Sequence, residues 1–372
     1  MRKILLWIGG GLCLLGGLLL IVTLAIGGFD FMKLSATEQF EDKIQVLPIE
    51  TVHTLRLDAE DQRVLLRPTD DGHITVRYRA FESDRYAFET QDGVCTITYR
   101  NEAPWYKNVV TGIFGGIARA GQEIVVEIPT AYAGALNART TNASLLAENL
   151  SGLTACTLNT SNGSLKGTRL SASSLNVGTT NAGILLEEVR TGVLAAKTTN
   201  GSLHLEGVEA AGEVIAGTTN AAASFRGVKA ASASLSSTNG SLRVENCTIQ
   251  GTLTAGTTNA SVHIADTAAA KAEASAGGGS LRLEGCTFAQ AVAARTANAS
   301  IRVERLASPD IRLDSTNGTI GGTIVGDPAA YSVATNTTNS SATPVSVFRQ
   351  DAAASLSAST TNARIALEFV EP

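Results

Sequence analysis

The chain has 372 residues, of which 44% are hydrophobic, 5% aromatic and 17% charged, and its formal net charge is −5. Its apolar residues recur with a regular period, which excludes a disordered chain. The mild negative charge and the lack of a Lys/Arg cluster exclude a nucleic-acid-binding surface. The five cysteines are too widely spaced to indicate a disulfide framework or a zinc site.

The first feature along the chain is an uncharged apolar run over residues 4–28, preceded by Arg2 and Lys3. This run is long enough to cross a hydrocarbon core of about 30 Å, whereas a cleaved signal peptide has an apolar core of about 7–15 residues. By the positive-inside rule, residues 1–3 are a cytoplasmic tail. We therefore expect 4–28 to be a transmembrane signal anchor of a single-pass protein of the cell membrane, with most of the chain extracytoplasmic. The alternative is a long signal peptide cleaved near Gly27.

Two segments separate this run from the repeats. Residues 29–46 are polar and mixed, and we interpret them as a linker; over 47–130, alternating apolar and polar residues predict β-strands. Residues 104–120 depart from the alternation, because they combine aromatic and aliphatic residues with glycines. We interpret them as a loop that covers the open end of the repeat structure; contact with lipid or a partner is the alternative.

Over 131–372 a unit of the form Thr-Thr-Asn-(Ala/Gly)-Ser-(Leu/Ile/Val) recurs twelve times, mostly at intervals of 19 or 20 residues. The asparagine marks each unit except one, which has Gly278. The asparagines are Asn142, Asn162, Asn181, Asn200, Asn220, Asn239, Asn259, Asn298, Asn317, Asn339 and Asn362. Self-similarity at a short fixed period is the signature of a solenoid.

The fold class follows from aligning the units on this position. Apolar residues fall three, five and eight places after it and six and four places before it. Their period of two predicts strands with one face inward, and the step from five to eight predicts a turn. We therefore expect an all-β fold: a single-stranded β-solenoid, or β-helix, of about twelve 19–20-residue coils, preceded by the strand-rich segment and one N-terminal transmembrane helix. Each coil should contain two clear strands and a looser third, where the one-residue change of length is absorbed.

We expect the asparagines to form a structural turn ladder. Asparagine tolerates the left-handed backbone conformation of a tight corner, and stacked amides can hydrogen-bond from coil to coil. Gly278 should take the same backbone shape. Cys156, Cys247 and Cys286 fall in apolar columns, so we expect free, buried thiols.

Two outward columns carry charge, four and six places after the asparagine. They place three Arg/Glu pairs on one face: Arg243 and Glu245, Arg282 and Glu284, and Arg302 and Glu304. A glycosidase needs one carboxyl with a raised pKa, but a basic neighbour lowers it. We interpret this stripe as a solvated charged face, with polymer binding as its functional alternative. His204 and His263 lie three coils apart, too far to share a metal, and we expect no catalytic residue, metal or cofactor.

The N-terminal apolar run, Gly28-Phe29-Asp30-Phe31, the strand-rich segment to Pro129 and the TTNGS and TTNAS units resemble a bacterial family. This family comprises envelope proteins described as candidate adhesins, with a β-strand repeat domain of unknown function. The resemblance implies an extracytoplasmic β-solenoid without catalytic residues. Some of its members resemble components of envelope-stress signalling in Gram-positive bacteria.

The sequence therefore favours a non-catalytic, adhesin-like or envelope-associated binding module, with envelope proteins or cell-wall polymer as partners. The first alternative is a self-assembling envelope scaffold that resembles bactofilins, because the chain finishes at Leu367–Pro372 without an evident cap. A carbohydrate-active β-helix enzyme is a disfavoured second alternative.

Overall fold

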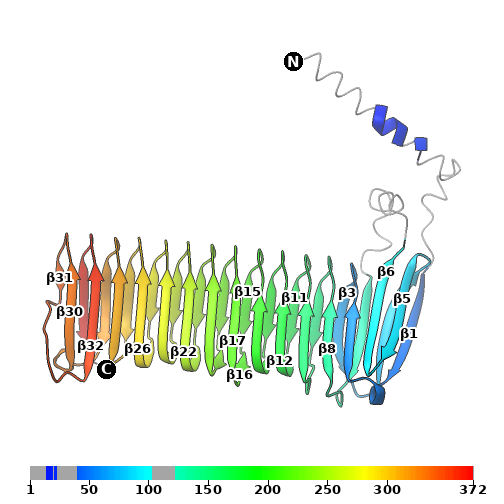
Figure 1. Ribbon diagram of the computed structural model, residues 1–372, viewed down its shortest axis with the longest axis horizontal. Helices are drawn as coiled ribbons and strands as arrows, with labels where there is room; N and C mark the ends of the chain where they lie inside the picture. Colours follow the sequence, from blue (N-terminus) through cyan, green and yellow to red (C-terminus); the bar gives the residue numbers. More distant parts are fainter. Residues whose placement is uncertain (1–13, 20, 23–39, 103–121, 372) are drawn as a thin grey trace.

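The computed structural model describes residues 14–19, 21–22, 40–102 and 122–371. Residues 40–102 and 122–371 form one elongated β-solenoid, in which the strands of successive coils stack into two long sheets (Figure 1). We call these sheets A and B. The hydrophobic core runs between them along the whole rod, as the predicted all-β solenoid requires.

Sheet A takes one strand from each coil, and nearly all of its neighbouring strands are parallel. In spatial order its strands are β1 (Phe40–Pro48), β4 (His73–Phe81), β7 (Glu123–Pro129), β3 (Arg63–Thr69), β9 (Leu145–Glu148), β11 (Leu165–Thr168), β13 (Ile184–Glu187), β15 (Leu203–Glu206), β18 (Ala223–Arg226), β21 (Leu242–Glu245), β23 (Val262–Ala265), β25 (Leu281–Glu284), β27 (Ile301–Leu306), β29 (Ile320–Val325), β33 (Ile365–Val370) and β31 (Ala342–Thr343).

Sheet B takes the second strand of each coil. Its strands are, in spatial order, β5 (Asp84–Gln91), β6 (Val94–Asn101), β2 (Thr54–Asp58), β8 (Ala135–Arg139), β10 (Ala155–Asn159), β12 (Ser171–Gly178), β14 (Arg190–Lys197), β17 (Glu213–Thr218), β20 (Ser232–Ser237), β22 (Thr248–Thr257), β24 (Ala268–Ala276), β26 (Thr287–Thr296), β28 (Asp310–Ser315), β32 (Ala354–Thr360) and β30 (Tyr331–Thr337). Two single turns of 3₁₀ helix, at Ile49–Thr51 and Pro328–Ala330, complete the described elements.

The predicted third segment of the coil is present and is the irregular part. It forms the short strands β16 (Glu209–Ala210) and β19 (Lys229–Ala230) in two coils. In others it runs into the main strand of sheet B through a shift of register, for example between Ile249 and Thr252. The difference between coils of 19 and 20 residues is absorbed here, because a bulge accommodates an extra residue without moving the inward columns.

The inward columns are the ones that the repeat alignment predicts. Leu203, Leu205 and Val208 of one coil are buried between the sheets. Cys156, Cys247 and Cys286 are free and buried, which confirms that they serve as small apolar residues. Burial raises the pKa of the Cys156 thiol to about 12 and that of Cys286 to about 11, so both stay protonated at neutral pH.

The order of coils in space differs from their order in the chain at both ends. At the N-terminal end, β2 and β3 lie between the later strands β6 and β7 and the repeat strands β8 and β9. At the C-terminal end, β32 pairs with β28 on one side and β30 on the other. The last coil of the sequence is therefore inserted inside the rod, and the C-terminus lies inward from its tip (Figure 1).

The strand order at both ends of the rod departs from simple parallel stacking, and residues that the sequence does not mark as a cap lie along β30 at the C-terminal end. At the N-terminal end, β1 and β5 pair antiparallel with β4 and β6, and the rings of Tyr78, Tyr86 and Phe88 stack across the core. At the other end, Val347 forms an antiparallel bridge with Val333 of β30. The sequence pattern missed these residues, 344–349, because they come before the last coil rather than after it.

The asparagine ladder forms as predicted. Each amide donates to the side-chain oxygen of the preceding coil, with distances such as 2.7 Å from Asn200 Nδ2 to Asn181 Oδ1 and 2.6 Å from Asn259 Nδ2 to Asn239 Oδ1. The ladder stops at Gly278 and resumes with Asn317, which donates to Asn298 over 2.9 Å. At the C-terminal end it follows the spatial order, because Asn362 donates to Asn317 and Asn339 donates to Asn362.

The predicted left-handed backbone at these asparagines is wrong. The ladder asparagines, all of them described, have a negative φ, and the positive φ falls seven residues later, at Asn149, Arg169, Glu188 and their equivalents. The sharp reversal comes after the strand of sheet A, where Asn246 has a φ of 53° and Gly285 a φ of 60°. Asparagine therefore suits the ladder position because its side-chain amide hydrogen-bonds to the neighbouring coil. It is not needed there for a left-handed backbone.

Gly278→Asn is expected to raise the free energy of unfolding. A Cβ at this position would meet its nearest atom, the carbonyl oxygen of Asn259, at an ordinary 3.4 Å, and Gly278 has no left-handed φ. The new amide would join the two halves of the ladder, and a net gain of about 0.5–1.5 kcal/mol is the usual contribution of a hydrogen bond. Urea unfolding followed by circular dichroism checks this. Asn200→Ala is the matched control, because it removes an amide from the ladder and should lower the midpoint. An unchanged or lower midpoint for Gly278→Asn would contradict the prediction.

The hydroxyl two residues before each asparagine forms a second, buried ladder. It donates to a backbone carbonyl of the preceding coil, as from Thr218 to Gly201 (2.9 Å) and from Thr296 to Gly279 (2.9 Å). Thr218 and Thr296 are less than a tenth exposed. A β-branched residue with a hydroxyl suits this position, because it continues the strand and bonds across the coils.

The residue after the ladder position alternates between alanine and glycine along the rod, except for Ser340 after Asn339. The alternating residues are Ala143, Gly163, Ala182, Gly201, Ala221, Gly240, Ala260, Gly279, Ala299, Gly318 and Ala363. In four of the five glycine coils its N–H donates to the buried hydroxyl, as from Gly240 to Ser237 over 2.9 Å. A Cβ on Gly240 would overlap the carbonyl oxygen of Ala221 in the preceding coil. The glycine coils therefore have no room for a side chain at this position.

Four predicted segments extend beyond the described residues, and the predicted cytoplasmic tail over 1–3 lies wholly outside them. Of the predicted anchor over 4–28, only residues 14–19 and 21–22 are described, and these are helical. Within the described residues, no helix has both the length and the apolar character needed to cross a membrane. The 104–120 loop lies outside the described residues. The predicted linker over 29–46 is described from residue 40, where β1 starts earlier than the expected strand boundary because β4 supplies an antiparallel partner.

Candidate binding surface

The outer face of sheet A carries the predicted stripe. Strand register aligns the position four places after each asparagine into one row, which crosses the sheet parallel to the rod. This basic row takes in His204, Arg243, His263, Arg282 and Arg302. A parallel row two residues further on contains Glu206, Glu245, Glu284 and Glu304.

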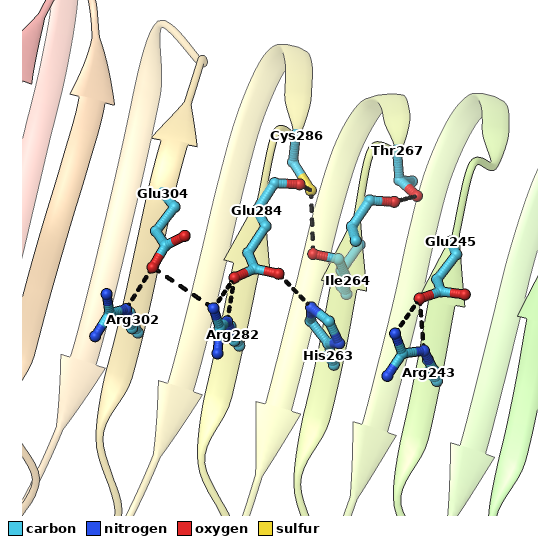
Figure 2. Close-up of polar contacts among 11 residues, drawn as sticks. Arg243, Glu245, His263, Ile264, Thr267, Arg282, Glu284, Cys286, Arg302 and Glu304 are labelled. Atoms are coloured by element: carbon cyan, nitrogen blue, oxygen red, sulfur yellow. Dashed lines mark hydrogen bonds and ion pairs between the residues drawn. The ribbon is translucent and has the colours of Figure 1, made fainter.

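Ion pairs tie these two rows together, within coils and between them (Figure 2). Arg243 Nε donates to Glu245 Oε1 over 2.5 Å, and Arg226 of the preceding coil reaches the other oxygen of Glu245 over 3.0 Å. Glu284 bonds Arg282 within its coil and His263 Nε2 of the preceding coil over 2.8 Å. Arg302 binds Glu304, which also lies 3.6 Å from Arg282. The charges are thus largely neutralised by their neighbours.

The same pairs keep the acids ionised. The hydrogen bond from Arg243, with that from Arg226, lowers the pKa of Glu245 below its usual value against the opposing effect of burial. Burial raises the pKa of Glu284, but its bonds to His263 and Arg282 outweigh this and lower it overall. A general acid of a glycosidase needs the opposite shift. These two carboxylates are therefore suited to binding cations or hydrogen-bond donors, and unsuited to donating a proton at neutral pH.

Glu245→Gln is expected to destabilise the protein at neutral pH and to have almost no effect in acid. Because the pKa of Glu245 is lowered by folding, its ionised form stabilises the native state above the unfolded pKa of about 4.3. That contribution is lost as the pH falls through the lower folded pKa. We expect a cost of roughly 1 kcal/mol near neutral pH, since both arginines are about half exposed.

Urea midpoints measured at several pH values between neutral and acid check this prediction. Glu206→Gln is the control, because Glu206 occupies the same row, is exposed and forms no ion pair among the described residues. A difference between wild type and Glu245→Gln that stays constant into acid would show that the ion pairs do not stabilise the fold.

Towards the N-terminal end, the basic row becomes apolar. Across β1, β4, β7, β3, β9, β11 and β13, register aligns Ile44, Arg77, Val125, Leu65, Leu146, Lys166 and Leu185. Ile44 is 59% exposed and its neighbour Val46 on β1 is 50% exposed. Leu65, Val125, Leu146 and Leu185 are partly exposed. We call this surface the apolar row.

Sequence reasoning missed the apolar row. Leu146 and Leu185 stand in the outward column four places after the asparagine, which we interpret as charged. These two leucines are the sign in the sequence that the column becomes apolar near the N-terminal end. The contributions of Ile44, Leu65 and Val125 were not detectable, because these residues lie outside the repeats. Their strands join the sheet in an order that differs from the chain order.

An open hollow of about 490 Å³ lies over the third segment of the coils. Arg190 and Lys229 flank it and both bind Glu209, over 3.2 and 3.0 Å. Small residues such as Ala210 and Ala230 form its floor. A hollow this open can support a chain lying across the surface, but does not enclose a small ligand.

The histidines do not come together. His204 and His263 lie in the same row of sheet A, three coils apart. Among residues 14–19, 21–22, 40–102 and 122–371, no group of three His, Cys, Asp or Glu side chains is arranged to hold a metal ion.

Structural comparison gives matches along most of the chain, at low identity. A candidate cell adhesion protein from Clostridium sporogenes is 8% identical, with 90% of this chain and 100% of that chain covered and a TM-score of 0.26. A candidate adhesin from Bacteroides fragilis is 10% identical, with 89% and 97% covered and a TM-score of 0.26. A candidate lipid binding protein from Parabacteroides distasonis is 10% identical, with 88% and 97% covered and a TM-score of 0.27.

No curated protein matches the chain. A family model does: that of Toastrack DUF4097, which matches residues 52–321. The match begins just before β2, ends in β29, and so spans most of the solenoid, including the stripe and most of the apolar row. The chain therefore belongs to the Toastrack DUF4097 family.

Proposed function

We propose that this protein is a membrane-anchored, extracytoplasmic binding rod that holds envelope proteins or wall polymer on its faces and carries out no chemistry. The observation that carries the proposal is the paired charge on sheet A. Glu245 and Glu284 have lowered pKa values and cationic partners, so this charged surface offers binding groups instead of an acid or a nucleophile. The uncharged run over 4–28, preceded by Arg2 and Lys3, supports the anchor and its orientation.

The solenoid geometry supports a binding role physically. Parallel coils repeat about every 4.8 Å, so side chains of one column present evenly spaced groups to an extended partner. Such a surface recognises a polymer by many weak contacts, each reinforced by the next. An adhesin-like role and a link to envelope polymers both use this property.

The strand pairing at the two ends of the rod argues against the alternative of a self-assembling scaffold. End-to-end growth needs edge strands that continue the parallel stacking of the coils. Here β1 and β5 run antiparallel to their neighbours at one end, and Val347 pairs antiparallel with Val333 at the other. Irregular pairing of this kind is one way in which proteins keep the edge strands of a sheet from pairing with another molecule.

Two measurements test the proposal. A single cysteine at Ser234, on the outer face of sheet B, should react with a membrane-impermeant maleimide in intact cells; protection until the cells are lysed would place the rod in the cytoplasm and refute the proposal. Light scattering of the full chain in detergent should give a mass that is independent of concentration. Growth into open-ended oligomers would instead favour the scaffold.

A further inference from the structure

The exposed apolar side chains of β1 need an explanation. Phe40 is 47% exposed, Ile44 59% and Val46 50%, and register places Ile44 at the start of the apolar row. The outer face of sheet B differs in the N-terminal coils, because register aligns the polar residues Arg56 of β2, Asn137 of β8 and Thr157 of β10 there. A monomeric protein rarely exposes a continuous apolar surface unless something covers it.

The charged residues beside the apolar row indicate what kind of partner could cover it. Arg67, Arg77 and Arg79 lie on the same face and are each about half exposed. Among the residues that the structure describes, they pair with two carboxylates: Arg67 and Arg77 share Glu127 (2.6 and 3.0 Å), and Arg79 binds Asp42 (3.0 Å). Arginines among aliphatic side chains suit a lipid surface, where their stems contact acyl chains and their guanidinium groups reach phosphates.

The chain itself brings this face to the membrane. Only 11 residues, 29–39, separate the uncharged run that ends at Gly28 from β1. Even fully extended they reach about 40 Å, at no more than 3.6 Å per residue. A tether this short gives β1 a high effective concentration at the bilayer, so weak contacts are sufficient to hold it there.

We propose that the apolar row of sheet A, together with the neighbouring exposed side chains of Phe40 and Val46 on β1, rests on the lipid bilayer, so that the N-terminal part of the rod lies along the membrane with sheet B facing away. This inference rests on the proposed anchor. In this orientation the outer face of sheet B and the distal part of the rod stay accessible to other partners.

The full chain reconstituted in phosphatidylcholine–phosphatidylglycerol vesicles tests this. With Cys13→Ser, the cysteines of the described solenoid are all buried, so a spin label can be placed at Ile44→Cys, Leu185→Cys or Val193→Cys. Leu185 and Val193 belong to the same coil, on the outer faces of sheets A and B, and Val193 is 48% exposed. We expect the ratio of oxygen to aqueous nickel-chelate accessibility to be several-fold higher at Ile44 and Leu185 than at Val193.

Equal ratios at Leu185 and Val193 would overturn the proposal. Dipolar broadening between labels at Ile44 in different copies would also overturn it, and would assign the face to a second copy of the chain. In the double variant Ile44→Asp and Val46→Asp, whose native side chains are exposed, the label at Leu185 should move into water. A label at Leu185 that keeps its lipid contact would show that β1 does not dock the rod.

A label at Leu14→Cys separates this inference from the proposed function. If Leu14 is in contact with lipid while Ile44 and Leu185 are in water, the anchor stands and the docking fails. If Leu14 itself is in water, the anchor fails, and the docking proposal that rests on it is refuted as well.

Discussion

Leu367→Ala is expected to lower the free energy of unfolding by about 2–5 kcal/mol, as for a core leucine in the middle of the rod. Five residues follow Leu367 in the sequence, and terminal residues ordinarily tolerate substitution. In this fold it is 2% exposed, because β33 is inserted between β29 and β31. Removing the side chain leaves a cavity in the core beside β29.

Urea unfolding, with hydrogen exchange to locate the loss, checks this effect. Leu283→Ala, at a buried position in a central coil, should cost a similar amount. Val345→Ala should cost less than about 0.5 kcal/mol, because Val345 is 71% exposed although it lies nearer to the spatial tip. The inserted order of coils would be falsified if Leu367→Ala were as mild as Val345→Ala.

Gly240→Ala is expected to destabilise the protein by roughly 3 kcal/mol or more. The added methyl would overlap the backbone carbonyl oxygen of Ala221, and backbone cannot move aside as a flexible side chain can. The coils on either side are held by the asparagine ladder, through Asn239 and Asn220 at 2.7 Å, so relief of the overlap must strain that ladder too. We expect hydrogen-exchange protection to fall in several adjacent coils.

Two substitutions serve as controls for this second effect. Ala221→Gly, at the alternate position, should cost only about 0.5–1 kcal/mol, the usual penalty of glycine flexibility. Gly72→Ala should be neutral, since no heavy atom lies within 4 Å of the new Cβ. Thermal and urea unfolding of the three variants would separate a clash specific to the glycine coils from a general intolerance of alanine.

The two halves of sheet A give the family fold two different surfaces. Its C-terminal half is a neutralised row of Arg/Glu pairs, and its N-terminal half is the apolar row. Because both lie on one continuous sheet, a change of residue type within an outward column changes the chemistry of the surface without changing how the rod folds. Solenoids evolve in this way because inward columns fix the core, while outward columns are free to vary.

The sequence by itself determined the repeating part. The period of the asparagine unit fixed the coil, the spacing of apolar residues fixed which side chains face inward, and the Asn200 column correctly predicted an amide ladder. These inferences succeeded because each depends on contacts between neighbouring coils, which repeat at a constant interval and so leave a pattern in the chain. The paired charges of Arg243 and Glu245 were predictable for the same reason.

Only the tertiary structure decided the ends, the backbone of the turn and the apolar row. The insertion of β32 and β33, the bridge from Val347 to Val333 and the placement of β2 between β6 and β8 are pairings between segments distant in sequence, and no local pattern records them. The residue with the left-handed backbone is Asn149 and its equivalents, not the ladder asparagine that the sequence suggested. The reason is that the chain reverses sharply after the strand of sheet A. Ile44 and Leu185 share a row only through strand register, which a period in the chain cannot specify.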